Sequence, residues 1–475
     1  MGALRLKAVS TDLGRRVAAH ALNRLGYGPR PGDIDAVLGQ GVEQWVEAQL
    51  SPAADPELDS RLAGLRTLGY SVSQVLALYN ADQRTLGVIL DEFNSAKMIR
   101  AVHGRNQLQE VLVDFWFNHF NVDVSGSFER FSVPAYERDA IRPHVLGRFR
   151  DLLGATAAHP AMLYYLDNYL SRGPRVVGGR AVTGLNENYG RELLELHTVG
   201  VSAGYTQADV IDSARCFTGW TIDNTTTGGN FVFVLANHDR EAKSVFGLSL
   251  PAGGAQDDGE RLLDFLATHA ATAQLVSRKL AQRFVSDDPP AGLVSAMAET
   301  FLDSGGDIAE VLRRMASSAA FWAAAFDGSS KAKTPIEFTA SALRALDAEV
   351  GSAQGLTTPI TGMGMPLYRC NPPTGYSNRG VEWLNPSAHL SRVNFGLDLA
   401  SGAVRGATVN PAAIVSGADL NDPRAIATAF GNEILPGRLS AQTIDAVARV
   451  DTRSTVSVSA RALGLLLSSP EFQVR

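Results

Sequence analysis

The sequence has little of what marks several classes of protein. Only two of its 475 residues are cysteines, Cys216 and Cys370, so at most one internal disulfide is available. Because two arbitrary cysteines seldom lie close enough to bridge, we expect two separate thiols. No apolar run approaches the roughly 18 to 20 residues that a membrane-spanning helix requires. We therefore expect neither a disulfide-held scaffold nor a membrane span.

Charge is also sparse. Charged residues make up 19% of the chain, hydrophobic residues make up 45%, and the formal net charge is -6. These values are typical of an ordinary globular protein. Because there is no basic excess of the kind that binds phosphate backbones, the composition argues against a nucleic-acid-binding protein.

The first residues, MGALRLKAVSTDLGRR, lack an apolar segment of about 7 to 15 residues that could form the core of a secretion signal. The sequence therefore shows no signal peptide. Two expectations remain open: the protein is cytoplasmic, or a signal has been removed.

Three catalytic motifs are missing. The sequence has no Gly-x-Ser-x-Gly elbow and no phosphate-binding loop ending in Gly-Lys-Ser/Thr, which weakens the cases for an α/β hydrolase and for a P-loop enzyme. It also lacks the His-Glu-x-x-His spacing of zinc proteases. These absences narrow the range of functions without choosing one.

Helical periodicity is what the chain does have. Apolar residues recur at helical spacing through most of it, for example in NQLQEVLVDFWFNHFNV at residues 106–122. A Thr/Gly turn followed by alternating apolar residues predicts a β-hairpin at about 219–240. Residues 351–380 are rich in glycine and proline and predict a long loop. We expect a mainly α, multi-helical single domain over residues 1–475.

One helical stretch, NENYGRELLELHTVG at residues 186–200, concentrates polar residues. Wound as a regular α-helix, it places Arg191, Glu192 and Glu195 on one face and turns His197 toward the leucines. Arg191 is then placed to compensate the repulsion between the carboxylates. If this face is buried, one carboxyl gains a raised pKa and can act as a general acid. If this face is exposed, Arg191 and the carboxylates form a routine surface ion pair. His197, on the leucine side, is expected to be a packed core histidine.

Two other segments hold polar groups in apolar surroundings. His119 follows three aromatic residues and an asparagine in FWFNHF, and His238 and Asp239 end the predicted hairpin with Lys243 close behind. An imidazole beside a carboxylate can serve as a base or a metal ligand. The alternative is a turn that Asp239 caps.

Several stretches together resemble, in order and over nearly the whole chain, a large bacterial family known as domain of unknown function 1800. The stretches are AHALNRLGYGPRPGDI, FWFNHFNV, MLYYLDN, NENYGRELLELHTVGV, GYTQADVIDSARCFTGW, NHDREAK, KTPIEF and YRCNPPTGYSN. The resemblance implies an exported, secreted or periplasmic bacterial protein, often with a sulfatase-like partner protein. It brings no established activity or cofactor. It does imply family-typical polar positions at Asn118, His119, Asn186, Glu187, Asn188, Arg191, Glu192, Glu195, His197, Arg215, His238, Asp239 and Lys243.

Three functional hypotheses follow. The first is a hydrolase acting on an extracellular polymer such as a polysaccharide. Its candidate catalytic residues are Glu192, Glu195, Arg191, His119 and His238, and its candidate substrate-binding residues are Asn118, Asn186, Glu187, Asn188, Asp239 and Lys243. One difficulty is that carboxyls one helical turn apart lie close together, whereas a glycosidase pair flanks its substrate.

The second hypothesis is a non-catalytic binding or assembly protein of the cell surface, in which the same polar residues form a structural ion-pair network and the long loop contacts the partner. The third is a metal-dependent enzyme that gathers His119, His197, His238, Glu192 and Asp239 around an ion. The sequence identifies no cofactor.

Overall fold

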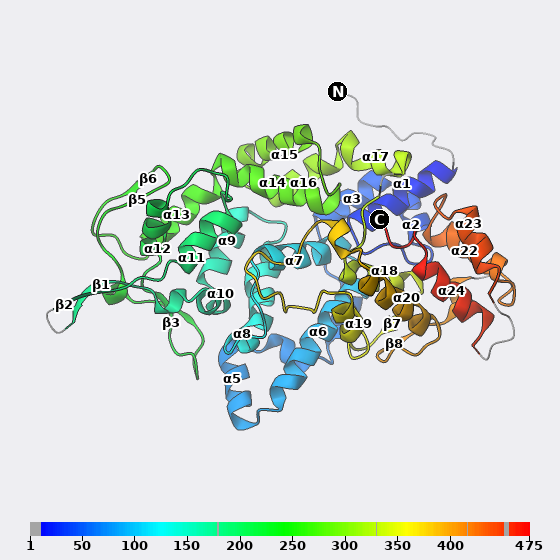
Figure 1. Ribbon diagram of the computed structural model, residues 1–475, viewed down its shortest axis with the longest axis horizontal. Helices are drawn as coiled ribbons and strands as arrows, with labels where there is room; N and C mark the ends of the chain where they lie inside the picture. Colours follow the sequence, from blue (N-terminus) through cyan, green and yellow to red (C-terminus); the bar gives the residue numbers. More distant parts are fainter. Residues whose placement is uncertain (1–10, 178–179, 329, 416, 451–455) are drawn as a thin grey trace.

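The structure is a computed structural model that describes residues 11–177, 180–328, 330–415, 417–450 and 456–475. It is mainly α and multi-helical, as predicted, and its strands form only short antiparallel pairs (Figure 1). Within the described residues, no helix combines the length and the apolar character needed to cross a membrane.

From Thr11 to Tyr165 the described chain forms ten α-helices. They are α1 Thr11–Arg24, α2 Asp33–Gln40, α3 Val42–Leu50, α4 Pro56–Leu62, α5 Val72–Ala81, α6 Thr85–His103, α7 Gln107–His119, α8 Glu129–Ala135, α9 Phe149–Ala158 and α10 Pro160–Tyr165. The middle of the chain forms α11 Asn188–Glu192, α12 Gln207–Cys216, α13 Asp257–Ala267, α14 Ala270–Phe284, α15 Ala291–Asp303, α16 Ile308–Ala316 and α17 Ala319–Asp327.

The last third forms α18 Pro335–Ala345, α19 Thr357–Gly362, α20 Pro386–Ala400, α21 Pro411–Ile414, α22 Pro423–Ile434, α23 Ala441–Val447 and α24 Val458–Ser468. Short 3₁₀ turns are η1 Arg66–Gly69, η3 Arg142–His144, η4 Asn168–Leu170, η6 Leu235–Asn237 and η7 Gly380–Trp383. Two segments are π-helical: η2 Tyr136–Ile141 and η5 Leu193–His197.

The strands form four antiparallel pairs in the described residues. They are β1 Arg172–Val177 with β2 Arg180–Gly184, β3 Trp220–Ile222 with β4 Phe231–Phe233, β5 Lys243–Val245 with β6 Leu248–Leu250, and β7 Glu349–Val350 with β8 Ala407–Thr408. The predicted hairpin is β3 and β4, but its alternation ends early because Leu235 begins a 3₁₀ turn. Sequence patterning missed the other pairs, since strands this short carry almost no period.

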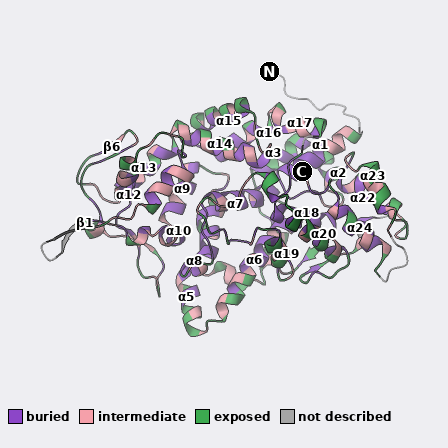
Figure 2. Cartoon of the chain, in the orientation of Figure 1, coloured by how far each residue is buried: buried purple, intermediate pink, exposed green. Residues whose placement is uncertain are grey.

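Helix α7 lies at the centre of the molecule, between α6 and α8 on one side and α14 on the other (Figure 1). Its apolar residues are buried, and so is the edge that carries Glu110 and Asp114 (Figure 2). Asp114 pairs with Lys97 of α6 at 2.9 Å, and Glu110 pairs with Arg142 at 2.7 Å. The polar edge of this helix therefore faces other elements rather than water.

The chain end is tied into the same interior. Arg475 is buried, and its guanidinium lies 2.9 Å from the Glu337 carboxylate of α18, which Arg283 of α14 also reaches at 3.0 Å. Burial alone would raise the pKa of Glu337, but the two guanidinium groups lower it to about 2. Stability from this carboxylate is therefore present above its ordinary pKa and is lost only as pH falls toward 2.

The glycine- and proline-rich segment 351–380 is irregular apart from α19 and the start of η7. Side chains from the centre of the molecule hold it down. The Asn118 amide donates to the Tyr376 carbonyl and accepts from the Tyr376 N–H, each at 2.6 Å. The Asn121 amide donates to the Cys370 carbonyl at 2.8 Å. The loop is thereby fixed against the end of α7.

Candidate functional site

The polar stretch at residues 186–200 folds into two short helical pieces rather than one regular helix. Helix α11 ends at Glu192, and the π turn η5 continues to His197. The turn is closed where the Thr198 hydroxyl donates to the Leu193 carbonyl at 2.5 Å and the Gly200 N–H donates to the Leu194 carbonyl at 2.8 Å. A π turn holds more residues than an α turn and occurs often at functional sites. The regular wheel assumed for this stretch therefore fails beyond Glu192.

Glu192 and Glu195 are half-buried neighbours at this junction. Burial raises the pKa of Glu192, the charge of Glu195 raises it further, and Arg191 opposes both. Since like charges cannot both be held close without cost, the proton is retained on Glu192 to a higher pH than on a free glutamate. The pair can thus present one carboxylic acid and one carboxylate.

Arg191 does not form the predicted ion pair with Glu195. Its guanidinium donates to the Glu187 carboxylate at 3.1 Å and to the Gln207 side chain at 3.0 Å, and Gln207 also donates to Glu187 at 2.7 Å. The predicted pairing is wrong because Arg191 turns back toward the start of its own helix. Glu192 and Glu195 consequently have no arginine in hydrogen-bonding contact among the residues that the structure describes.

A buried histidine and lysine support the π turn from behind. The Nε2 atom of His119 lies 3.1 Å from the His197 carbonyl, and its Nδ1 atom lies 3.0 Å from the Lys279 ammonium. Because a carbonyl can only accept, His119 must carry its proton on Nε2 and accept at Nδ1. Lys279 donates also to the Leu196 carbonyl at 3.3 Å. Two successive carbonyls of the turn are thus held by one hydrogen-bonded pair.

The protonation of this pair follows from its burial. Burial lowers the pKa of Lys279 to about 8, and burial with the nearby Lys279 charge lowers the pKa of His119 well below its usual value. His119 is therefore neutral at pH 7 and fixed in one tautomer. His197 is only 2% exposed, and burial lowers its pKa to about 3, which confirms the prediction of a packed core histidine.

Two tyrosines border the carboxyls. Burial raises the pKa of Tyr165 and Tyr205, and Glu192 contributes to the shift of both, with Glu195 the larger contributor at Tyr205. The Tyr165 hydroxyl donates to the Asn371 carbonyl at 2.6 Å. The long loop that Asn118 holds down thus meets Tyr165 beside Glu192. The site thus takes residues from five of the family-like motifs: His119, Tyr165, Glu192, Tyr205 and Asn371.

Asn186 and Asn188 act on the backbone at the start of α11. The Asn186 side chain accepts from the Asn188 N–H at 2.9 Å, and the Asn186 N–H donates to the Ser171 hydroxyl at 3.1 Å. This asparagine turn starts the helix that carries Glu192. The exposed Asn188 side chain remains available to a ligand.

The second group of predicted residues forms a separate cluster, which we call the buried triad: His238, Lys243 and Asp258. All three side chains are 0% exposed. One oxygen of Asp258 accepts from the Lys243 ammonium at 2.6 Å and lies 3.1 Å from His238 Nε2. Lys243 donates also to the carbonyls of Asp239 and Glu241.

Asp239 joins this cluster through its backbone carbonyl, which accepts from Lys243, and its carboxylate pairs with Arg215. The guanidinium of Arg215 donates to both Asp239 oxygens, at 2.7 and 3.0 Å, and the Glu241 N–H donates to the same carboxylate at 2.9 Å. Burial alone would raise the pKa of Asp239, but these hydrogen bonds lower it. Among the described residues, no hydrogen bond or ion pair links this cluster to the carboxyls Glu192 and Glu195.

The ligand set of the metal hypothesis is not assembled. His119 and His197 lie near each other, with ring centroids 6.2 Å apart, but His238 and Asp239 belong to the buried triad and its neighbour Arg215. In the part of the chain that the structure describes, no group of three or more His, Cys, Asp or Glu side chains is placed to hold a metal ion. Cys216 and Cys370 are both buried and free, which confirms two separate thiols.

Sequence reasoning missed Lys279, Tyr165, Tyr205 and Asp258. A signal existed for Lys279, because it occupies the apolar stripe of its helix beside Val276 and Leu280, where a lysine needs a partner. Tyr165 belongs to the family-like motif MLYYLDN. Tyr205 belongs to the family-like motif GYTQADVIDSARCFTGW. Asp258 carried no signal, since an acidic residue in the first turn of a helix is ordinary.

Comparison with known proteins finds a relationship at the level of the family. No curated protein and no solved structure matches the chain. One family model, described as protein of unknown function (DUF1800), matches residues 20–474 of the 475. With nearly its whole length matched, the chain belongs to the DUF1800 family of proteins of unknown function.

Proposed function

We propose that this protein is a hydrolase that cleaves the glycosidic bonds of an extracellular polysaccharide, with Glu192 as general acid. The carrying observation is the half-buried Glu192, whose raised pKa is due to burial and to Glu195 beside it. A general acid must keep its proton at the working pH, and a neighbouring carboxylate must stay charged. The bordering tyrosines offer flat faces against which sugar rings can stack.

The close spacing of the two carboxyls favours one stereochemical course. Glu195 lies close enough for its charge to raise the pKa of Glu192. A retaining glycosidase uses carboxyls about 5–5.5 Å apart, whereas an inverting enzyme needs a wider gap. Glu195 would attack the anomeric carbon while Glu192 protonates the departing oxygen. Glu192 would then take a proton from the water that releases the sugar from Glu195.

We propose that other predicted residues position the two carboxyls or border them. His119 and Lys279 hold the carbonyls of the π turn and so fix the direction of Glu195. Arg191 and Glu187 form the rim, and Asn118 fixes the loop that approaches Tyr165. His238, Asp239 and Lys243 would stabilise the neighbouring structure rather than contact substrate, because their polar groups are paired inside the fold.

Family membership supports a location outside the cytoplasm for the protein and its substrate. Members resemble exported bacterial proteins, so we propose a secreted or periplasmic location, where a polysaccharide would be met. A sulfatase-like partner protein would fit this setting, because sulfate esters are common decorations of such polymers. Cell fractionation with an antibody to the native protein tests the location.

The function is tested by incubating wild-type protein and Glu192→Gln with a panel of bacterial and plant polysaccharides and measuring new reducing ends. We expect cleavage of at least one polymer and a loss of about 10²- to 10⁴-fold in the variant. The wild-type rate should fall as pH rises through the raised pKa of Glu192. Glu299→Gln, at an exposed glutamate of α15 away from the site, is the matched control and should keep the wild-type activity. Equal rates for wild type and Glu192→Gln would refute the proposal.

A second candidate is a non-catalytic binding protein of the cell surface. One observation favours it: the long loop forms, with α6, a polar pocket of about 640 Å³ lined by Asp91, Asn94, Gln354, Thr357 and Arg369. Hydroxyl, amide and charged groups of this kind can hydrogen-bond to a carbohydrate. Saturable binding of a polymer that the protein never cleaves would support this candidate over the hydrolase.

A further inference from the structure

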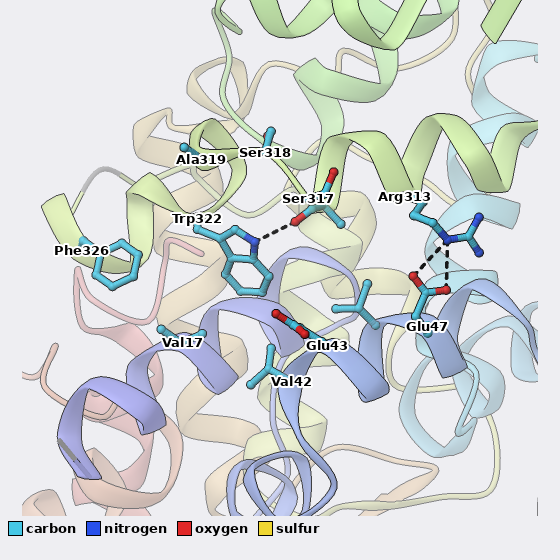
Figure 3. A pocket seen from close by; sticks show the side chains of 12 residues that line it. Val17, Val42, Glu43, Glu47, Arg313, Ser317, Ser318, Ala319, Trp322 and Phe326 are labelled. Carbon is cyan, nitrogen blue, oxygen red and sulfur yellow. Dashed lines mark hydrogen bonds and ion pairs between the residues drawn. The ribbon is translucent and has the colours of Figure 1, made fainter. Parts of the chain in front are cut away.

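A second pocket-like region lies far along the chain from the carboxyl site, by which we mean Glu192 and Glu195 at the π turn. It differs in character from that site. It has a volume of about 340 Å³ and is formed by α1, α3, α16 and α17 (Figure 3). Its size falls at the lower end of the range of small-molecule sites, about 300–1,000 Å³. None of the residues to which we assign a role in hydrolysis lines it.

The walls of the pocket are apolar and partly preformed. Val17, Val42 and Val46 are buried side chains that form one side, and Trp322 and Phe326 form the other. The Trp322 indole N–H donates to the Ala316 carbonyl at 2.7 Å, which fixes the ring. Phe326 is 43% exposed, so its ring is accessible to a ligand in the pocket.

The charges at the pocket are unbalanced. Its lining contains two carboxylates, Glu43 and Glu47, and one guanidinium, Arg313. Arg313 lies 3.0 Å from Glu47 and is also paired with Glu310, so its charge is already used. Within the described part of the chain, Glu43 has no cation within ion-pairing distance. Figure 3 shows Glu43 pointing from α3 toward the Trp322 ring.

We propose that this pocket binds a hydrophobic ammonium ligand, a small molecule with an apolar body and one protonated amine. The apolar body would fill the space between the valines and Phe326, because burying apolar surface is the main driving force for such binding. The ammonium would meet the Glu43 carboxylate and the face of Trp322, which attracts cations through its ring electrons. A carboxylate-bearing amphiphile would instead be repelled by Glu43.

The proposal is tested with decylamine, decanol and decanoate, titrated into the full-length protein below their micelle-forming concentrations. Binding is followed by calorimetry and by tryptophan fluorescence. We expect one saturable site for decylamine and weaker binding of the neutral and anionic chains. Glu43→Gln should weaken decylamine binding about three- to fivefold, the range of a partly exposed ion pair, with little change for decanol. Glu382→Gln, an exposed glutamate outside the pocket lining, is the matched control.

A second variant distinguishes ligand binding in the pocket from binding elsewhere on the surface. Ala319 lies exposed at the first position of α17 and lines the pocket, so Ala319→Trp should fold and fill the space. It should abolish saturable binding of all three chains. Equal binding of decylamine and decanoate, or decylamine binding that survives Ala319→Trp, would overturn the proposal.

Discussion

The carboxyl site at the π turn and the buried triad use similar residues in opposite ways. In the triad, Lys243 and His238 share one oxygen of Asp258, and all three side chains are closed off from solvent. At the π turn, Glu192 and Glu195 lie half-buried beside each other, and no arginine in the described part of the chain bonds to either. A paired and enclosed polar group stabilises a fold, whereas an underpaired and accessible one retains the capacity to react.

The largest expected effect comes from breaking the triad. Lys243→Met removes the cation and leaves the Asp258 carboxylate buried with His238 alone, so the free energy of unfolding should fall by about 3–5 kcal/mol. Urea unfolding measures this. The control is Arg424→Met in the exposed Arg424–Asp445 pair, which should cost less than about 1 kcal/mol. Equal small losses in both variants would show that the triad is not structural.

A smaller effect is expected from the lysine behind the π turn. The pKa of Lys279 in the folded protein is about 8, below its ordinary 10.5. Below pH 8 the folded protein therefore holds a charged, buried lysine, which lowers the free energy of unfolding. This loss of stability disappears as pH rises toward 10.5. Wild-type stability should gain roughly 1–3 kcal/mol over this range relative to Lys279→Met.

The free energies of unfolding of wild type and Lys279→Met, measured at pH 7, 8, 9 and 10, test this prediction. The nearby exposed residue Arg278 provides the control, since Arg278→Met should keep the wild-type pH dependence. If Lys279→Met and the wild type follow parallel curves, the lysine is not held as the structure shows.

The comparison is sharpened by two carboxyls with opposite pH behaviour. The folded pKa of Glu192 is raised, so its charge costs stability as pH rises above the ordinary glutamate value. Glu192→Gln should thus be as stable as wild type at pH 4 and up to about 1 kcal/mol more stable at pH 7.

The folded pKa of Asp239 is lowered, so its stabilising effect is present above the ordinary aspartate value and is lost as pH falls through the folded pKa. Asp239→Asn should therefore be less stable than wild type at pH 7, and the gap should narrow in acid. Thermal unfolding at both pH values checks each variant. If Glu192→Gln and Asp239→Asn both changed stability at pH 7 in the same direction relative to wild type, the contrast between the two regions would be wrong.

The smallest effect is expected on the rim. Arg191 and Glu187 form an i, i+4 pair with side chains 40% and 37% exposed, a geometry worth about 0.3–0.5 kcal/mol. Arg191→Ala should therefore barely change the melting temperature. Arg215→Ala, which breaks the two-oxygen contact with buried Asp239, should cost clearly more, and the reverse order would contradict our assignment of rim and interior.

Much of the fold was predictable from the sequence because helical periodicity extends along long segments. The mainly α class, the hairpin of β3 and β4 and the irregular segment around residues 351–380 all rest on local patterns. The π turn was not predictable, since leucines at residues 193, 194 and 196 fit an α period as well. The short strand pairs were missed for the same reason, as two or three residues define no period.

The sequence by itself determined the family, the helical class and the blocks in which polar residues gather. Only the tertiary structure decided which of those residues are paired. His119 meets Lys279 from 160 positions away, and Gln207 of the next helix hydrogen-bonds with both Arg191 and Glu187. Burial and the choice of partner decide whether the pKa of a carboxyl is raised or lowered. Both depend on segments distant in sequence, and no local pattern records them.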